Sequence, residues 1–259
     1  MIQTIPPPPT PLARYSDLAG RVVFISGGAT GIGRDLVMAF AEQGAQVLFV
    51  DINAEAGADL AKICGPDTHF RACDVTDDVA LHAAIDAAEA LGGLDILVNN
   101  AANDQRLGID AVTAADWQRL VDVNLRHQFF ASQRAAHHMA TRGRGSIIMF
   151  GSVAPEIKVP NLAVYSACKS AIRGLTRSLA KDLGGVGIRV NAILPGAILT
   201  EKQRTLWYPD QASIDAMTDQ QCLSRELTGR DVAEMALFLA SDVSAACTAQ
   251  NFIVDGGIL

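Results

Sequence analysis

The sequence predicts a single α/β domain in which helices cover both faces of a parallel β-sheet. Short apolar runs rich in β-branched residues alternate with longer stretches whose apolar residues recur at helical spacing, from residue 21 to residue 254. No linker interrupts this alternation, and no repeat is longer than one strand–helix–strand unit. Because parallel strands joined by helices cross over with one hand, the pattern predicts a doubly wound sheet.

Length, charge and cysteine usage restrict the class of protein further. The 259 residues fit one large α/β domain, and the net charge of -7 argues against a nucleic-acid partner. No apolar run reaches the ~20 residues of a membrane span, and residues 1–11 lack the features of a secretory signal. The five scattered cysteines include no Cys-x-x-Cys pair. We therefore expect a cytoplasmic protein with reduced thiols, no metal site and no membrane partner.

The chain begins with a proline-rich stretch. Residues 6–9 and Pro11 are all proline and can enter neither a helix interior nor a central strand. We expect residues 1–15 to form a flexible, extended arm without chemistry. The predicted strands and helices all fall within residues 16–259.

The first strand–turn–helix unit contains a glycine-rich turn. A strand predicted at residues 21–25 precedes the turn, and a helical stretch that ends at Gly44 follows it. The turn reads Ser26-Gly27-Gly28-Ala29-Thr30-Gly31-Ile32-Gly33. Glycines in such a turn adopt positive φ and allow a diphosphate to approach the backbone amides at the helix start. A lone glycine-rich turn is a weak signal, but its strand–helix context predicts a dinucleotide site.

A carboxylate ends the second predicted strand, at residues 46–50. Asp51 lies about 20 residues beyond the glycines, where a carboxylate can accept both ribose hydroxyls and repel a 2′-phosphate. We therefore expect NAD as the cofactor. NADP is the alternative, because Arg34 and Asn53 lie nearby in the sequence.

Polar side chains also follow the next two predicted strands. Asp74 comes after the strand at residues 68–73, and it is a candidate either for the adenine amino group or for a helix N-cap. Asn100 comes after the strand at residues 95–98. Its amide can brace neighbouring strands beside the cofactor.

A tyrosine and a lysine form the main candidate for chemistry. Tyr165 and Lys169 lie four residues apart in a helical stretch at residues 162–183, so their side chains share one face. A nearby ammonium lowers the pKa of a tyrosine from its usual ~10, which would make Tyr165 a general base. Ser152 follows a strand at residues 146–150 and can reach the same reacting oxygen. The alternative, a surface Tyr and Lys, is not excluded by this spacing alone.

The segment after the next strand indicates the substrate class. Helices are predicted at residues 113–139 and 229–240 and strands at 189–193 and 251–254. Residues 196–228 are too polar to form a lid for a steroid or an acyl chain. Aromatic rings beside amides and charges suit a compact polyol instead. Further polar residues expected at the same rim are Asn103, Asp104, Arg106 and Glu156, with solvated loop positions as the alternative.

These motifs together resemble the short-chain dehydrogenase/reductase family over nearly all of the chain after the arm. One departure is Ala102, where the family usually has glycine. The resemblance implies a Rossmann-like domain with a seven-stranded parallel sheet at residues 16–259, which binds a dinucleotide, carries the catalytic site and assembles into a homotetramer. The matching positions are Gly27-x-x-x-Gly31-x-Gly33, Asp51, Asp74, Asn99-Asn100-Ala101, Asn124, Ser152, Tyr165-x-x-x-Lys169, Pro195-Gly196 and Thr200.

The resemblance also implies the site residues. The catalytic tetrad would be Asn124, Ser152, Tyr165 and Lys169, with Lys169 also holding the nicotinamide ribose and Asn124 seating a water that passes the proton on. A helix-interior amide that satisfies nearby backbone is the alternative for Asn124. Thr200 would hold the nicotinamide carboxamide. The expected cofactor contacts are Ser26, Gly27, Thr30, Gly31, Ile32, Gly33, Asp51, Asp74, Val75, Asn100, Ala101, Tyr165, Lys169, Pro195, Gly196 and Thr200.

A closer resemblance concerns the substrate. Residues 103–106, 123–127, 202–208 and 237–242 are similar to bacterial aldose 1-dehydrogenases acting on L-arabinose, D-xylose or D-galactose. The working hypothesis is NAD-dependent oxidation of the anomeric hydroxyl of an aldose, L-arabinose first, to the aldonolactone. The expected substrate contacts are Asn103, Ser152, Glu156, Tyr165, Gln203 and Trp207, the last as a platform for the sugar ring. Alternatives are a 3-oxoacyl-thioester reductase and a cofactor-binding module without turnover, which the intact tetrad disfavours.

Overall fold

The computed structural model describes residues 13–259 and contains one seven-stranded, fully parallel sheet. The strand order is β3-β2-β1-β4-β5-β6-β7, so the chain moves outward in one direction from β1 and returns to build the other half from β4. The strands are β1 (Val22–Ser26), β2 (Gln46–Asp51), β3 (Thr68–Ala72), β4 (Leu94–Asn99), β5 (Gly145–Phe150), β6 (Ile188–Pro195) and β7 (Asn251–Val254). The reversal between β1 and β4 creates the crevice in which open α/β sheets bind ligands.

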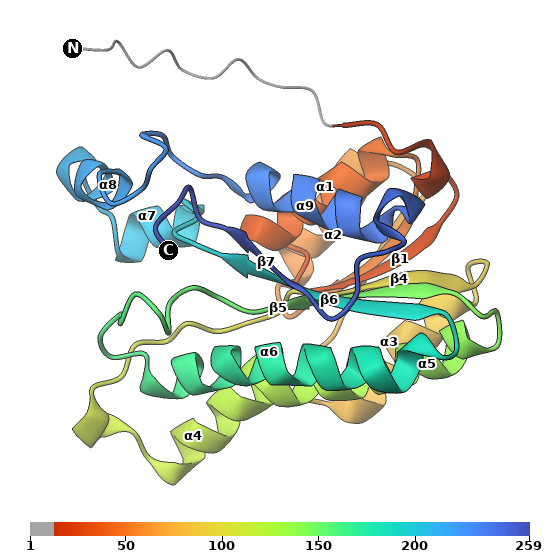
Figure 1. Ribbon diagram of the computed structural model, residues 1–259, viewed down its shortest axis with the longest axis horizontal. Coiled ribbons are helices and arrows are strands. Elements are labelled where there is room, and N and C mark those ends of the chain that lie inside the picture. The colour runs from red at the N-terminus through yellow and green to blue at the C-terminus, as the bar shows by residue number, and fades with distance from the viewer. Residues whose placement is uncertain (1–12) are drawn as a thin grey trace.

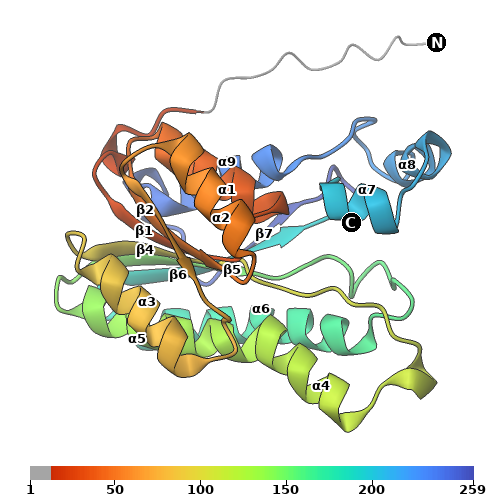
Figure 2. The ribbon, with the colours of Figure 1, turned by 180° about the vertical axis from the view of Figure 1, so that it is seen from behind.

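Helices cover both faces of the sheet (Figures 1 and 2). One face carries α1 (Gly31–Glu42), α2 (Ala54–Cys64) and α9 (Gly229–Ala240), and the other carries α3 (Asp78–Glu89), α5 (His127–Ala140) and α6 (Ala163–Gly184). Two apolar clusters fill the space between the helices and the two faces of the sheet. Strands β1 and β4 are buried along their whole length, which explains why they read as continuous apolar runs rather than alternating ones.

The helical region predicted at residues 113–139 is one continuous helix with a local change of winding. It consists of α4 (Ala114–Val121), a π-helical turn η3 (Asp122–Arg126) and α5. A π-helical turn inserts one residue into the helix and turns the following side chains to new directions. Asn124, one of the predicted site residues, lies in this turn and is fully buried.

The segment between β6 and α9 extends beyond the carboxyl edge of the sheet. It contains two short helices, α7 (Glu201–Leu206) and α8 (Gln211–Thr218), which stand apart from the layers in Figure 1. Short 3-10 turns complete the structure at η1 (Ser16–Leu18), η2 (Ile109–Ala111) and η4 (Asp242–Ser244). The helix α7 begins directly after Thr200, so it lies next to the strand ends where the site is expected.

Three further expectations can be compared with the structure. All five cysteines are free thiols. Within residues 13–259, no helix combines the length and the apolar character that crossing a bilayer requires. Most of the predicted arm, residues 1–12, lies outside the described part of the chain, so its expected flexibility stays a prediction.

Candidate active site

A cavity of about 980 Å³ opens at the carboxyl edge of the sheet. Its lining comes from the ends of β1 to β6 and from the segment that contains α7. This position is the crevice at the reversal of strand order, where α/β sheets bind ligands. The volume is at the upper end of the range for ligand pockets, so the cavity can hold a nucleotide together with a small second molecule.

The glycine turn forms one end of the cavity from backbone alone. Gly27 has a φ of 68°, and a Cβ there would lie 2.7 Å from the Cα of Ala101. A Cβ on Gly33 would lie 1.8 Å from the carbonyl oxygen of Gly27. Thr30, the N-cap of α1, makes no capping hydrogen bond with its side chain, so the first amides of α1 are left for another acceptor. This turn fits a diphosphate on both sterics and hydrogen bonding.

The Asp51 carboxylate is held at the end of β2 by backbone amides. One oxygen accepts a hydrogen bond from the Ala29 amide and the other from the Asn53 amide, both at 3.0 Å. Asn53 is committed elsewhere, because its side chain caps α2 through the Ala56 amide. The carboxylate therefore lines the cavity in one orientation, as expected for a group that recognises ribose hydroxyls.

Asp74 lines the cavity and does not cap the helix that follows it. Its carboxylate accepts hydrogen bonds from the amide and the hydroxyl of Thr76, whereas the N-cap of α3 is Asp77. Of the two interpretations of Asp74, the helix cap is thus excluded. Val75 lies beside it in the lining.

Asn100 braces the two central strands, as its amide predicts. It donates hydrogen bonds to the carbonyls of Ser26 and Gly27 at 3.2 and 2.8 Å. Ser26 itself is fully buried, and its hydroxyl accepts a hydrogen bond from the Ala101 amide. Ser26 therefore supports the turn and does not reach the cavity, contrary to the expectation that it contacts the cofactor.

Residues at the end of β6 close the cavity on the side of α7. Pro195, Gly196 and Thr200 all belong to the lining. Thr200 caps α7 by accepting a hydrogen bond from the Gln203 amide at 3.3 Å, and its methyl group would lie 3.2 Å from a Cβ on Gly31. The segment between β6 and α9 and the glycine turn thus meet at Thr200.

Tyr165 and Lys169 share one face of α6 and both line the cavity. The Lys169 ammonium lies 5.6 Å from the centroid of the Tyr165 ring and donates a hydrogen bond of 2.8 Å to the Phe150 carbonyl at the end of β5. Lys169 is only 1% exposed. Burying an ammonium is costly, so a lysine in this position indicates a functional site.

The protein's own groups do not lower the pKa of Tyr165. Burial raises that pKa to about 12, with the nearby Ser152 hydroxyl acting in the opposite direction and the Asp104 charge adding to the rise. Burial lowers the pKa of Lys169 to about 8. In the protein by itself, burial therefore sets the direction of the Tyr165 pKa, and the activation of Tyr165 by Lys169 stays a prediction.

Asn124 contacts backbone rather than the cavity. Its amide nitrogen donates to the carbonyls of Asn103 and Leu120, and its oxygen accepts from the Asn103 amide, each at 2.9 Å. This is the alternative in which the amide satisfies nearby backbone. It also holds Asn103, which does line the cavity, in place. The water-seating role of Asn124 stays a prediction.

Two of the expected substrate contacts lie apart from the cavity. Glu156 forms an ion pair of 2.6 Å with Arg173 on α6. The ring of Trp207 is covered by the Arg106 guanidinium, 3.7 Å from its centroid, and the ring does not belong to the lining. The structure thus corrects both expectations, because each side chain is engaged by a partner distant in the sequence. Ser152 and Gln203 do line the cavity.

Sequence reasoning missed some of the lining. Tyr208 lines the cavity where Trp207 does not, and Arg119 of α4 also reaches it. The residue types gave no signal here, since Trp207 and Tyr208 are adjacent aromatics and only the course of the chain after α7 separates them. Arg119 lies on a helix whose position depends on packing against α6 and η3.

The geometry defines a class of protein before any comparison. A glycine turn at a helix start, a carboxylate at the end of β2 and a Tyr–Lys–Ser group, all around one cavity, are the parts expected of an oxidoreductase that uses a nicotinamide dinucleotide. A family model described as enoyl-(acyl carrier protein) reductase matches residues 27–259. The chain belongs to the short-chain dehydrogenase/reductase family and is an NAD(P)-dependent dehydrogenase.

Individual relatives support this assignment. The chain is 48% identical to a probable galactose dehydrogenase, GalD, of Rhizobium meliloti (strain 1021), over 96% of this chain and 98% of that protein. It is 39% identical to the D-xylose 1-dehydrogenase of Caulobacter vibrioides (strain NA1000 / CB15N), over 95% and 98%. The crystal structure of a putative gluconate dehydrogenase from Agrobacterium tumefaciens superimposes with a TM-score of 0.88 at 30% identity, covering 95% of this chain and 98% of that one.

Proposed function

We propose that the enzyme oxidises the anomeric hydroxyl of an aldose to the aldonolactone, with NAD as the hydride acceptor. The observation that carries this proposal is the Tyr165, Lys169 and Ser152 group in one cavity of a chain that is 48% identical to a probable galactose dehydrogenase. D-galactose and D-xylose are the first candidates because of the two relatives. L-arabinose, the first choice from the sequence, stays on the list because its pyranose has the C2 to C4 configuration of D-galactose.

The residues divide the reaction between them. The Tyr165 oxygen takes the proton of the anomeric hydroxyl, and the Ser152 hydroxyl holds that oxygen as it becomes a carbonyl. Lys169 holds the nicotinamide ribose and keeps a positive charge beside the phenol. When bound, NAD+ supplies the hydride acceptor and a further positive charge, which opposes the effect of burial on the Tyr165 pKa. A hemiacetal hydroxyl is also more acidic than an ordinary alcohol, which reduces the demand on the base.

The adenosine end favours NAD over NADP. The cofactor contacts would be the glycine turn, Asp51, Asp74 and Asn100, which line one continuous part of the cavity. Both Asp51 oxygens are held by amides, so the carboxylate cannot easily turn away from a 2′-phosphate. The resulting repulsion disfavours NADP.

The charges at the rim disfavour the rival function on a carrier-bound acyl thioester. An acidic carrier requires a patch of free cations beside the cavity. In the described part of the chain, Lys202 and Arg204 on α7 are paired with Asp104 and Glu226, respectively, and Arg106 lies on Trp207. The charges of Lys202 and Arg204 are therefore compensated and the guanidinium of Arg106 is engaged by the indole, which leaves little of a cationic patch for an acidic carrier.

The test is a substrate panel with purified enzyme. NADH formation is followed at saturating NAD with D-galactose, D-xylose, L-arabinose and D-glucose. The rival reaction, reduction of a thioester, is tested with NADH and an acetoacetyl thioester. Trapping the product with hydroxylamine identifies a lactone. We expect sugar-dependent reduction of NAD and a trapped lactone. Thioester reduction without any sugar oxidation would contradict the proposal.

A further inference from the structure

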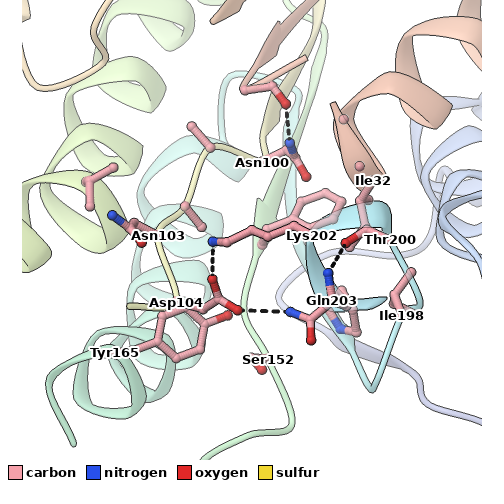
Figure 3. A pocket seen from close by; sticks show the side chains of 18 of the residues that line it. Ile32, Asn100, Asn103, Asp104, Ser152, Tyr165, Ile198, Thr200, Lys202 and Gln203 are labelled. Atoms are coloured by element: carbon pink, nitrogen blue, oxygen red, sulfur yellow. Dashed lines mark hydrogen bonds and ion pairs between the residues drawn. The ribbon is translucent and has the colours of Figure 1, made fainter. Parts of the chain in front are cut away.

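Two segments from distant parts of the chain meet at the rim of the cavity. The Asp104 carboxylate lies in the loop after β4. It accepts hydrogen bonds from two side chains of α7, the Lys202 ammonium and the side-chain amide nitrogen of Gln203, the latter at 2.9 Å (Figure 3). These partners lie 98 and 99 residues away in the sequence. Each oxygen of Asp104 accepts one of these hydrogen bonds, so the carboxylate joins the loop after β4 to α7.

The carboxylate is also part of the cavity wall. Asp104, Lys202 and Gln203 all line the cavity that contains Tyr165 and Lys169. The side chain of Asp104 is 22% exposed and that of Lys202 is 51% exposed, so the ammonium is the more hydrated of the pair. The Asp104 charge reaches both groups on α6: burial dominates their pKa values, but the carboxylate raises each of them. Any substrate near Tyr165 thus lies within the field of Asp104.

We propose that Asp104 is a specificity-determining residue that restricts the site to uncharged aldoses and excludes uronic acids. The pairing stops Lys202, one of the cations in the cavity wall, from attracting a substrate carboxylate. Because Lys202 is the more exposed partner, it compensates the Asp104 charge only in part, and the rest of that charge repels an anion. This inference rests on the proposed aldose oxidation and adds the charge class of the substrate. The same pairing explains why Lys202, at the rim of the cavity, does not attract anionic substrates to the site.

The electrostatics set the size of the effect. A substrate carboxylate entering a partly desolvated cavity would meet the partly compensated charge of Asp104 and would find the Lys202 ammonium already paired, which together cost on the order of a factor of ten to one hundred in affinity. In Asp104→Asn, an amide replaces the Asp104 carboxylate, which removes the repulsion of a substrate anion and also frees the Lys202 ammonium. Both changes act in the same direction on an anionic sugar and leave a neutral sugar nearly unaffected.

The alternative role of Asp104 is that of a simple latch for α7. Its loss would then loosen α7 and weaken the binding of every substrate by a similar factor. The two roles are separated by a pair of sugars that differ only in charge. D-galactose and D-galacturonate share their ring configuration and their anomeric hydroxyl, and they differ at C6, which is a hydroxymethyl group in one and a carboxylate in the other.

The experiment measures kcat/KM for both sugars in the wild type and in Asp104→Asn, Lys202→Met and the double variant. We expect Asp104→Asn to lower the galactose-to-galacturonate ratio at least tenfold, mainly through faster use of galacturonate. Lys202→Met should raise the ratio, because it leaves Asp104 uncompensated. The double variant should fall between the two single variants. Hydrogen exchange of residues 201–208 reports separately on whether α7 has loosened.

Asp110→Asn is the matched control, since it makes the same substitution at an exposed position of the loop after β4 that does not belong to the cavity lining. The ratio should change less than twofold in this variant. An unchanged ratio in Asp104→Asn, or an equal shift in Asp110→Asn, would overturn the role of Asp104 while leaving the aldose function intact. A wild type that oxidises no aldose would remove both proposals.

Discussion

The two ends of the cavity are built in different ways. The cofactor end consists of backbone and small residues at the ends of buried strands, where Gly27 and Gly33 leave no space for a side chain. The substrate end consists of long side chains on segments outside the sheet, joined by the contacts of Asp104 with Lys202 and of Arg106 with Trp207. The first end depends on short stretches of sequence, and the second depends on which distant segments meet. Substitutions should therefore have large, general effects at the first end and smaller, substrate-dependent effects at the second.

The largest effect is expected from Gly33→Ala. A methyl group there would overlap the Gly27 carbonyl, so the turn must open. We expect NAD binding to weaken at least a hundredfold and the free energy of unfolding to fall by about 1–3 kcal/mol. Calorimetric titration with NAD and denaturant unfolding measure the two quantities. Gly174→Ala is the control, because that helical glycine has open space around it and its replacement should stabilise α6 by up to ~1 kcal/mol. A Gly33→Ala protein with normal NAD affinity would show that the turn is less constrained than described.

A smaller effect, confined to the choice of cofactor, is expected from Asp51→Asn. The substitution removes the charge that repels a 2′-phosphate but keeps an oxygen for the Ala29 amide. The ratio of kcat/KM with NAD to kcat/KM with NADP should fall on the order of ten- to one hundredfold, with sugar KM nearly unchanged. Initial rates with both cofactors provide the measurement. An unchanged ratio would mean that another group selects the nucleotide.

The smallest effect is expected from Trp207→Phe. Arg106 covers the indole, and a phenyl ring retains most of that contact, so we expect the sugar KM to change less than threefold. Trp207→Ala removes the contact, worth about 0.5–1 kcal/mol, and should raise KM modestly by loosening α7. A tenfold rise of KM in Trp207→Phe would restore the original hypothesis that the indole is the platform for the sugar.

The same difference between the two ends decides what the sequence predicts. The strands predicted at residues 21–25, 46–50 and 146–150 agree with β1, β2 and β5 to within one residue, because buried parallel strands are continuous apolar runs. Tyr165 and Lys169 share a face because helical spacing requires it. Such local rules are sufficient for the fold and for most of the cofactor end.

The rest depended on contacts between distant residues. Glu156 was expected at the substrate and instead pairs with Arg173, and Trp207 was expected to be open and is covered by Arg106. Nothing in the local sequence indicates either partner. In the protein by itself, the direction of the Tyr165 pKa also depends on burial, which the spacing to Lys169 does not indicate.

The central claim is that Tyr165 accepts the proton of the sugar hydroxyl. The most direct measurement is the single-turnover rate of NADH formation in Tyr165→Phe at saturating sugar and NAD, together with the NAD dissociation constant. General base catalysis of this kind contributes about 10²–10⁴-fold, so we predict a rate at least 10²-fold below that of the wild type, with NAD affinity within about twofold. A Tyr165→Phe enzyme that forms NADH as fast as the wild type would contradict the account.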